Sequence, residues 1–239
     1  MRNIAVILAG GVGSRMGGPE PKQFLLLGGR TVIEHSIETF ANHPSIDEVA
    51  VVIHPDWRGR MEEIAARGRW EKLRKIVDGG SERYMSSLNA IMAYIDEPDD
   101  TNLLLHDAAR PFMSAAIVDR VVAALERHEA VGVAVPSTDT VWEVHTDITG
   151  DSLGRFVSRI PERRFMWRAQ TPQAFRLPQI RDAYQRALQD PQFAATDDCG
   201  VVRKYMPGIK IAVVEGSHRN LKVTTPQDIA TLEQIQKEE

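Results

Sequence analysis

The amino-acid sequence predicts an α/β fold, a mostly parallel sheet flanked by helices, with a projecting β-arm. Short β-branched runs alternate along the chain with amphipathic segments, which is typical of a parallel sheet covered by helices. Several runs are apolar almost without interruption, as strands are when helices cover both faces of their sheet. With 239 residues and 43% hydrophobic content, the chain can build a single domain over residues 1–239.

The predicted strands follow these apolar runs. They cover Ile4–Leu8, Glu48–Ile53, Lys75–Val77, Asn102–His106, Gly132–Val135 and Lys210–Val214. Ligands of open α/β sheets bind beyond the carboxyl ends of the strands. The segments that follow the strands are therefore the places to search for a site.

Three helices carry recognisable start signals. Thr31 followed by Glu34 forms the pattern of a capping box before an apolar series at helical spacing. Ser114 precedes a second series of that kind. Thr225, with Pro226 at the first helical position, predicts the start of the last helix.

Residues 139–164 follow a different pattern. The segment is polar and lacks helical periodicity, and Thr140–Val144 alternates like a strand. It is interpreted as a β-arm that leaves the sheet. Because a strand pair away from its own core tends to be covered by another subunit, the arm predicts a homodimer.

Composition limits the classes of partner. The net charge of −4 gives no overall basic field, so no nucleic-acid partner is expected, and anionic substrates must be bound by local Arg and Lys clusters. The single cysteine, Cys199, has no partner for an intrachain disulfide, which fits a cytoplasmic location. No apolar stretch approaches the roughly 20 residues that span a bilayer, so no membrane partner is expected either.

A Gly-rich loop follows the first predicted strand and is a candidate phosphate-binding loop. Glycines allow the backbone to approach a ligand and to point N–H groups at phosphate oxygens. The loop lacks the third Gly of a dinucleotide fingerprint and has no G-K-[ST] of a Walker loop. Two cations, Arg15 and Lys22, accompany it and suit a triphosphate. The alternative is a tight turn with two solvated basic residues.

Asp107 is the candidate metal ligand because it lies where the fourth predicted strand ends. Mg²⁺ prefers one or two carboxylates together with waters and substrate oxygens, so a single Asp suffices for this hypothesis. Arg110 would be an anion contact or would fix the loop in place. The alternative is a capping Asp107 paired with Arg110. His106 is interpreted as a packed or hydrogen-bonded strand residue, since no second His or Cys lies at ligand spacing.

These segments together resemble the IspD family of cytidylyltransferases, which make 4-diphosphocytidyl-2-C-methylerythritol from CTP and 2-C-methyl-D-erythritol 4-phosphate. They resemble equally the TarI-type enzymes, which act on D-ribitol 5-phosphate. The resemblance runs nearly the full length, through AGGVGSRMG, PKQF, DGGSER, HDAARPF, WRAQTPQAF, TDD and LKVTTPQD. It implies a Rossmann-like nucleotidyltransferase domain with a projecting β-arm for dimerisation, and a homodimer whose arms complete the neighbouring sites. It also implies the cofactor Mg²⁺, with CTP and a small polyol phosphate as substrates.

The resemblance also assigns site residues. It implies a catalytic set of Arg15, Lys22, Asp107 and Lys222, with Asp107 as the metal ligand. The implied nucleotide-binding residues are Ala9, Gly10, Gly11, Gly13, Gly80, Ser81, Arg83 and Ser86. The implied substrate-binding residues are Ala108, Arg110, Thr140, Arg163, Thr171 and Thr196.

The sequence segments that bear on the identity of the acceptor disagree with one another. Leu8-Ala9-Gly10-Gly11 resembles the ribitol branch, whereas Ala109 and Trp167-Arg168-Ala169-Gln170 resemble the methylerythritol branch, which we favour. Ser81 replaces an acidic residue that is common in the base pocket of the family. Alternatives outside the family are an NAD(P)-dependent reductase, a nucleotidyltransferase that uses UTP or GTP, and a non-catalytic nucleotide-binding subunit.

Overall fold

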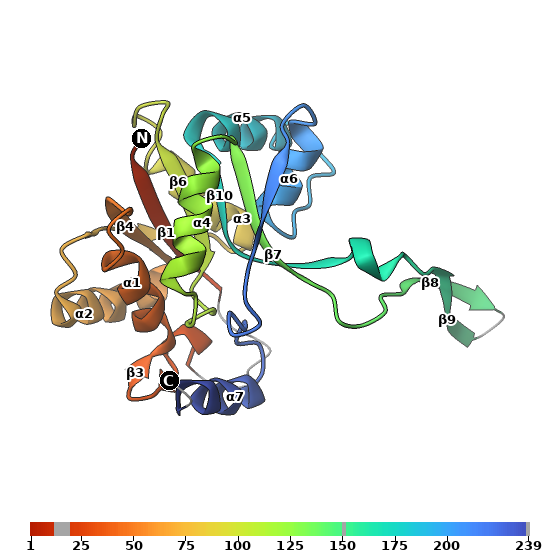
Figure 1. Cartoon of the computed structure of the whole chain (residues 1–239), viewed down its shortest axis with the longest axis horizontal. Coiled ribbons are helices and arrows are strands. Elements are labelled where there is room, and N and C mark those ends of the chain that lie inside the picture. The colour runs from red at the N-terminus through yellow and green to blue at the C-terminus, as the bar shows by residue number, and fades with distance from the viewer. Residues whose placement is uncertain (12–19, 150–151, 238–239) are drawn as a thin grey trace.

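The computed structural model describes residues 1–11, 20–149 and 152–237 (Figure 1). For residues 148–149 and 152–153 it describes the backbone alone. A seven-stranded sheet has the order β11-β7-β10-β6-β1-β4-β5. Its strands are β1 (Asn3–Ala9), β4 (Glu48–Ile53), β5 (Leu73–Asp78), β6 (Asn102–Asp107), β7 (Ala130–Pro136), β10 (Trp167–Arg176) and β11 (Ile211–Glu215). Only β10, of these seven, runs antiparallel to its neighbours, β6 and β7. The predicted mostly parallel sheet is confirmed.

Helices cover both faces of the sheet (Figure 1). They are α1 (Val32–Ala41), α2 (Arg58–Gly68), α3 (Arg83–Met92), α4 (Ala115–Leu125), α5 (Leu177–Ala187), α6 (Asp198–Tyr205) and α7 (Pro226–Lys237). The first, second and fourth helices pack on one face, and α3, α5 and α6 pack on the other. Successive residues of β1 enter the two cores alternately, since side chains of a strand point to opposite faces. That is why the strand sequences are apolar throughout.

The six strands predicted from apolar runs are all present, with ends that differ by no more than two residues. The three predicted helix starts are also confirmed. At the start of α1, the backbone N–H and the hydroxyl of Thr31 both donate to the Glu34 carboxylate at 2.7 Å. Helix α7 begins at Pro226 and packs its buried Leu232 against Leu27, which lies in a small β2–β3 hairpin (Leu26–Leu27 and Arg30–Thr31). Gly28 and Gly29 have positive φ angles and form the turn of that hairpin.

Strand β10 was not predicted, and its sequence explains why. It mixes polar and apolar residues without strict alternation and contains Pro172, which lacks a backbone N–H and is rare inside sheets. The pairing with β7 shifts register between Gln170 and Gln173, so the proline falls in an irregularity where no ladder hydrogen bond is needed. The Thr171–Pro172 peptide bond is cis.

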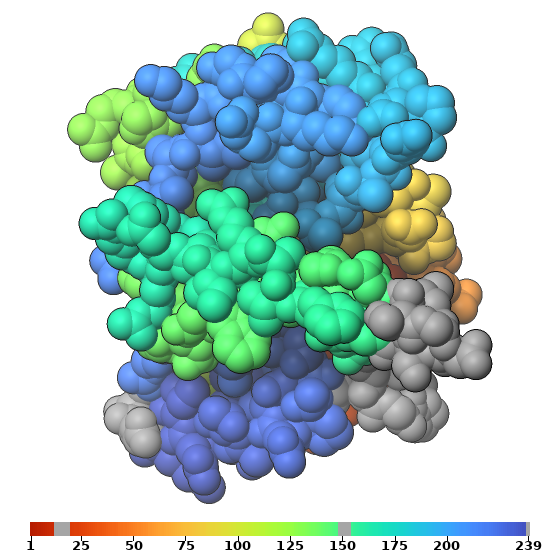
Figure 2. Space-filling view, turned by 90° about the vertical axis from the view of Figure 1, so that its right-hand side faces the viewer, coloured from red at the N-terminus to blue at the C-terminus, as the bar shows by residue number. Residues whose placement is uncertain are grey.

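The predicted arm stands away from the body as a hairpin of β8 (Glu143–Thr149) and β9 (Ser152–Arg159) (Figure 1). Figure 2 views the molecule from the side to which the arm points. The predicted strand at Thr140–Val144 was placed too early, because Thr140 and Trp142 precede β8. Large apolar side chains on the arm are exposed, among them Trp142 at 60% and Ile160 at 59%. The arm therefore presents apolar surface that its own chain leaves uncovered. No helix of the described residues is long and apolar enough to cross a bilayer.

Candidate active site

A cavity of about 250 Å³ opens beyond the carboxyl ends of β1, β5 and β6, where the sequence places the site. Most of its lining residues are predicted site residues. The lining consists of Leu8, Gly10, Gly11, Lys22, Gly80, Ser81, Glu82, Arg83, Ser86, Asp107, Ala109 and Lys222. Four segments that are far apart in the sequence therefore meet in one pocket.

The Gly-rich loop lies directly against the start of α3. A Cβ on Gly10 would lie 2.4 Å from the Ser86 hydroxyl oxygen, so a side chain at this position would displace that hydroxyl, and a Cβ on Gly79 would lie 3.0 Å from the Gly10 Cα. The Gly80 N–H donates to the same hydroxyl at 3.3 Å. The glycine at position 10 thus allows the backbones after β1 and β5 to approach each other at the cavity wall.

Asp107 is the last residue of β6, and its carboxylate lies between two cations. The Lys222 ammonium donates to one oxygen at 2.6 Å, and Arg83 Nε donates to the other at 3.3 Å. Burial alone would raise the pKa of Asp107, but the charges of Arg83 and Lys222 outweigh burial and hold it well below its usual range. The carboxylate is therefore ionised at every pH at which the protein would work.

The backbone of Asp107 is fixed from β10. Its N–H donates at 3.1 Å to the hydroxyl of Thr171, which also hydrogen-bonds the ring of His106. His106 is fully buried, and burial lowers its pKa to about 4, so the ring is neutral. This agrees with the interpretation of His106 as a packed, hydrogen-bonded residue. Thr171, implied to contact the polyol, is 4% exposed and directs its hydroxyl at this strand end.

Lys22 and Arg110 both connect to the segment that carries Lys222. Lys22 lines the cavity, and its ammonium donates to the carbonyl of Val223 at 2.9 Å. Arg110 lies outside the cavity lining and donates to the carbonyl of Asn220 at 2.8 Å. Of the two roles predicted for Arg110, this hydrogen bond supports fixing a loop in place, and the contact with an anion stays a prediction.

The remaining implied residues lie elsewhere. Ala9 and Ala108 pack their side chains in the core, and Thr196 is exposed in the loop before α6. Thr140 and Arg163 belong to the arm, away from the cavity of their own chain (Figure 1). Gly13 and Arg15 lie outside the described residues.

Three residues were missed as site residues. Leu8 and Glu82 line the cavity, and both lie inside or next to motifs that carried the resemblance. Asp198 touches the cavity residue Arg83 from α6, with 2.8 Å between the charged atoms. Its place in the TDD motif was the one available signal. Nothing in the sequence pairs it with Arg83.

The chemistry of the cavity agrees with a metal bound mainly through a substrate. Among the described residues, no three His, Cys, Asp or Glu side chains form a cluster that could enclose an ion. Asp107 offers one ionised carboxylate next to basic groups that suit phosphates. Mg²⁺ needs no more protein than that when phosphate oxygens and waters complete its shell.

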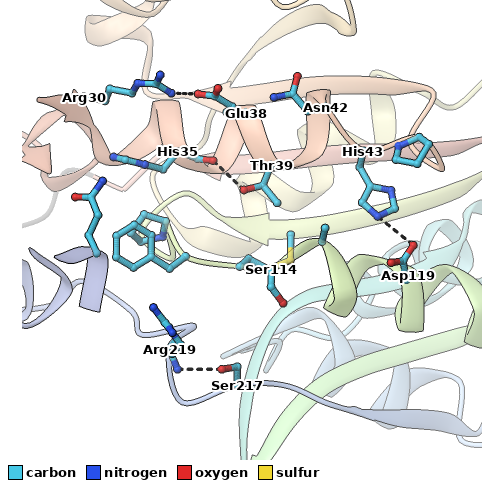
Figure 3. Close-up of a pocket in the computed structure, with 16 residues that line it drawn as sticks. Arg30, His35, Glu38, Thr39, Asn42, His43, Ser114, Asp119, Ser217 and Arg219 are labelled. Carbon is cyan, nitrogen blue, oxygen red and sulfur yellow. Dashed lines mark hydrogen bonds and ion pairs between the residues drawn. The ribbon is translucent and has the colours of Figure 1, made fainter. Parts of the chain in front are cut away.

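Wider clefts in the described part of the chain hold none of the predicted residues. One of about 770 Å³ lies between α1 and the loop before α4 (Figure 3). Its charged groups face one another, since Arg30 pairs with Glu38 and His43 lies 3.2 Å from Asp119. Such internal pairing leaves no excess of one charge, in contrast to the basic 250 Å³ cavity.

The chain is similar to known proteins over nearly its full length. The family model IspD, described as 2-C-methyl-D-erythritol 4-phosphate cytidylyltransferase, matches residues 3–238. A protein of that description from Thermobifida fusca is 47% identical over 234 residues, which cover 98% of this chain and 93% of the relative. The bifunctional ribulose 5-phosphate reductase/CDP-ribitol pyrophosphorylase Bcs1 of Haemophilus influenzae is 40% identical over 95% of this chain, which spans 47% of that protein. The crystal structure of 4-diphosphocytidyl-2C-methyl-D-erythritol synthase from Anaerococcus prevotii superposes with a TM-score of 0.82 at 29% identity, covering 99% of this chain and 98% of that one.

Proposed function

The chain belongs to the IspD family of cytidylyltransferases, and we propose that it transfers CMP from CTP to 2-C-methyl-D-erythritol 4-phosphate, releasing pyrophosphate, in the synthesis of isoprenoid precursors. One observation carries the proposal. Three cations, Lys22, Arg83 and Lys222, line one cavity with the ionised Asp107, which Arg83 and Lys222 contact, and Gly10 and Gly11 of the Gly-rich loop line the same cavity. A site for two phosphorylated substrates needs this concentration of positive charge next to backbone N–H groups.

The chemistry requires positioning and charge neutralisation more than covalent work by the protein. A phosphate oxygen of the acceptor forms a bond to the α-phosphorus of CTP, and the bond to the bridging oxygen breaks, so that pyrophosphate leaves with the electron pair. Because two anions must approach each other, cations that neutralise them supply much of the rate. We assign Lys22 and Arg15 to the triphosphate, and Lys222, with Arg163 of the arm, to the acceptor phosphate. The acceptor phosphate is already nucleophilic near neutral pH, so no general base is required.

Asp107 is the residue that would hold Mg²⁺. When bound, the metal would polarise phosphate oxygens and neutralise charge that develops on them. The 2.6 Å contact of Lys222 with Asp107 supports the view that this carboxylate organises the cations of the acceptor side even before a metal is considered.

We propose further that the enzyme works as a homodimer in the cytoplasm. The exposed apolar side chains of the arm, such as Trp142 and Ile160, support an assembly in which a second arm covers them. Thr140 and Arg163 lie on the same arm, outside the cavity of their own chain, and we expect them to act at the neighbouring site.

A second candidate acceptor is D-ribitol 5-phosphate. Leu8-Ala9-Gly10-Gly11 favours it, and so does the 40% identical relative whose name includes CDP-ribitol pyrophosphorylase. The two acceptors differ by a methyl branch and a hydroxyl. A pocket that hydrogen-bonds a hydroxyl rejects a compound lacking it strongly, whereas an apolar pocket rejects an added hydroxyl only weakly.

The test of this proposal is pyrophosphate release in the presence of Mg²⁺, with each nucleoside triphosphate and each acceptor offered separately. CTP with 2-C-methyl-D-erythritol 4-phosphate is expected to be the best pair. Turnover with UTP or GTP in place of CTP, or no turnover with any pair, would contradict it.

A further inference from the structure

Asp198 is a buried carboxylate directly behind the cavity. It is the first residue of α6, and its side chain is fully excluded from solvent. Tyr184 of α5 donates its hydroxyl hydrogen bond to one carboxylate oxygen at 2.7 Å. The backbone N–H of Asp198 donates to the Gln173 side chain at 2.9 Å, so α6 is anchored to β10 at this point. A buried carboxylate requires such partners, since an unpaired one is costly.

The charge of Asp198 is paired with Arg83. Arg83 Nη1 lies 2.8 Å from the second oxygen of Asp198, while its Nε donates to Asp107 on the other side. Burial opposes the charge on Arg83, but Asp198 and Asp107 outweigh burial and raise the pKa of its guanidinium. The guanidinium is therefore held between two carboxylates, one inside the cavity and one behind it.

This arrangement fixes where Arg83 lies. Its backbone starts α3, next to Gly80 and Ser81 of the cavity wall, and its long side chain has several rotatable bonds. Without the contact from behind, the guanidinium would keep only its weaker contact with Asp107, at 3.3 Å. It would then no longer be held in place beside Gly80 and Ser81 of the cavity wall.

We propose that Asp198 is a positioning residue that fixes Arg83 for nucleotide binding, a role that rests on the proposed function of the cavity. Asp198 touches no solvent and lines no part of the cavity, so it acts through Arg83. Tyr184 and Gln173 in turn hold Asp198. Helix α6 is thereby coupled to the nucleotide side of the site and not to the acceptor side.

The experiment compares Asp198→Asn with wild type in CTP titrations of turnover and in direct CTP binding without acceptor. The Asn side chain keeps the shape and can still accept from Tyr184, but it removes the charge opposite Arg83. We expect the KM for CTP to rise on the order of 10-fold or more, because small displacements of positioned groups have effects of that size. The KM for the acceptor is expected to change by less than about 2-fold. The proposal would be overturned if the KM for CTP and the KM for the acceptor rose equally. It would also be overturned if neither KM rose.

Two further variants separate positioning from a general loss of stability. Tyr184→Phe removes the hydrogen bond that the Asp198 carboxylate accepts from Tyr184 and leaves the ion pair with Arg83. This variant is therefore expected to lower Tm without the 10-fold rise in KM for CTP. In an Arg83→Gln background, Asp198→Asn is expected to add less than about 2-fold to that KM. An undiminished additional effect would show that Asp198 does not act through Arg83.

The outcome stays interpretable if Asp198→Asn does not fold or if the proposed reaction is wrong. Asp198→Glu keeps the charge but displaces it by one methylene, and an unchanged KM for CTP in that variant would also overturn the proposal. Direct CTP binding reports on Arg83 whatever the acceptor is. Wild type that binds CTP but makes no product would contradict the proposed function alone.

Discussion

The ionisation state of the Asp107 carboxyl group is determined by the residues around it. Burial alone would favour the neutral acid, and the cations Arg83 and Lys222 reverse that preference, so the carboxyl pKa falls. The folded protein thus binds this proton less readily than the unfolded chain. The resulting stabilisation is present above the ordinary carboxyl pKa of about 4 and is lost as the pH falls below it.

Replacing Asp107 by Asn is the first test at this scale. The amide cannot balance Lys222 and Arg83 and is a poor ligand for Mg²⁺, so turnover is expected to fall and its dependence on Mg²⁺ concentration to weaken. Steady-state rates over a Mg²⁺ series measure both effects. An Asn variant that folds and keeps the wild-type rate and Mg²⁺ response would mean that the metal site is elsewhere.

Lys22→Ala and Arg15→Ala test the triphosphate assignment. Each removes a positive charge proposed to stabilise the transition state, and each is expected to lower kcat on the order of 10²-fold or more. Lys204→Ala is the matched control, because Lys204 is exposed on α6 and pairs with Asp190 outside the cavity. If Lys22→Ala and Arg15→Ala both kept a near wild-type kcat, the triphosphate would lie elsewhere.

His106 predicts a pH dependence of stability. Its folded pKa of about 4 lies below the ordinary value of about 6.5, so between these values the unfolded state takes up a proton that the folded state does not. As the pH falls from 6.5 to 4, the free energy of unfolding is expected to lose about 1.4 kcal/mol per pH unit from this residue. Urea unfolding of wild type and His106→Gln over this range measures the difference. Parallel pH profiles of the two proteins would contradict it.

Individual site residues were predictable where a motif carried them. Lys22, Asp107 and Lys222 lie in recognisable segments, and the structure brings all three to one cavity. The contact of Asp198 with Arg83 was not predictable, because it depends on how α6 packs behind α3 and no local pattern reports such packing. The hydrogen bond from Asp107 to Thr171 was missed for the same reason, since it crosses between strands that are distant in the sequence.

At the scale of elements, prediction succeeded where local physics determines the conformation. The capping box of α1 and the apolar runs of β1, β4 and β6 depend on neighbouring residues, and these elements were predicted. Strand β10 exists because β6 and β7 flank it on both sides. Its partly polar, proline-containing sequence shows neither the apolar period of a helix nor that of a strand. The arm was predicted as an excursion, but its pairing register was not.

The arm provides the test at this scale. If Arg163 acts at the neighbouring site, then mixing an Arg163→Ala variant with a Lys22→Ala variant, with subunit exchange, produces dimers that contain one intact site. Activity is expected to recover to about a quarter of wild type from random mixing of two such subunits, because half the dimers are mixed and each has one of its two sites intact. The unmixed variants are the controls. No recovery, or a fully active monomer in light scattering, would contradict a shared site.

At the scale of the whole molecule, the sheet order places the carboxyl ends of β1, β5 and β6 around one cavity, and the amino end of β10 enters beside it. The fold class follows from the sequence because the alternation of strands and helices leaves few topologies. The acceptor does not follow, since the preference between two similar polyol phosphates depends on a few contacts. Ala109, one of the residues on which the proposed preference for the branched acceptor rests, lines the cavity.

The most direct measurement is the specificity constant kcat/KM for the two polyol phosphates, determined side by side with CTP and Mg²⁺ by pyrophosphate release. We predict a higher value for 2-C-methyl-D-erythritol 4-phosphate. A tenfold preference for D-ribitol 5-phosphate, which corresponds to about 1.4 kcal/mol in transition-state binding, would contradict it.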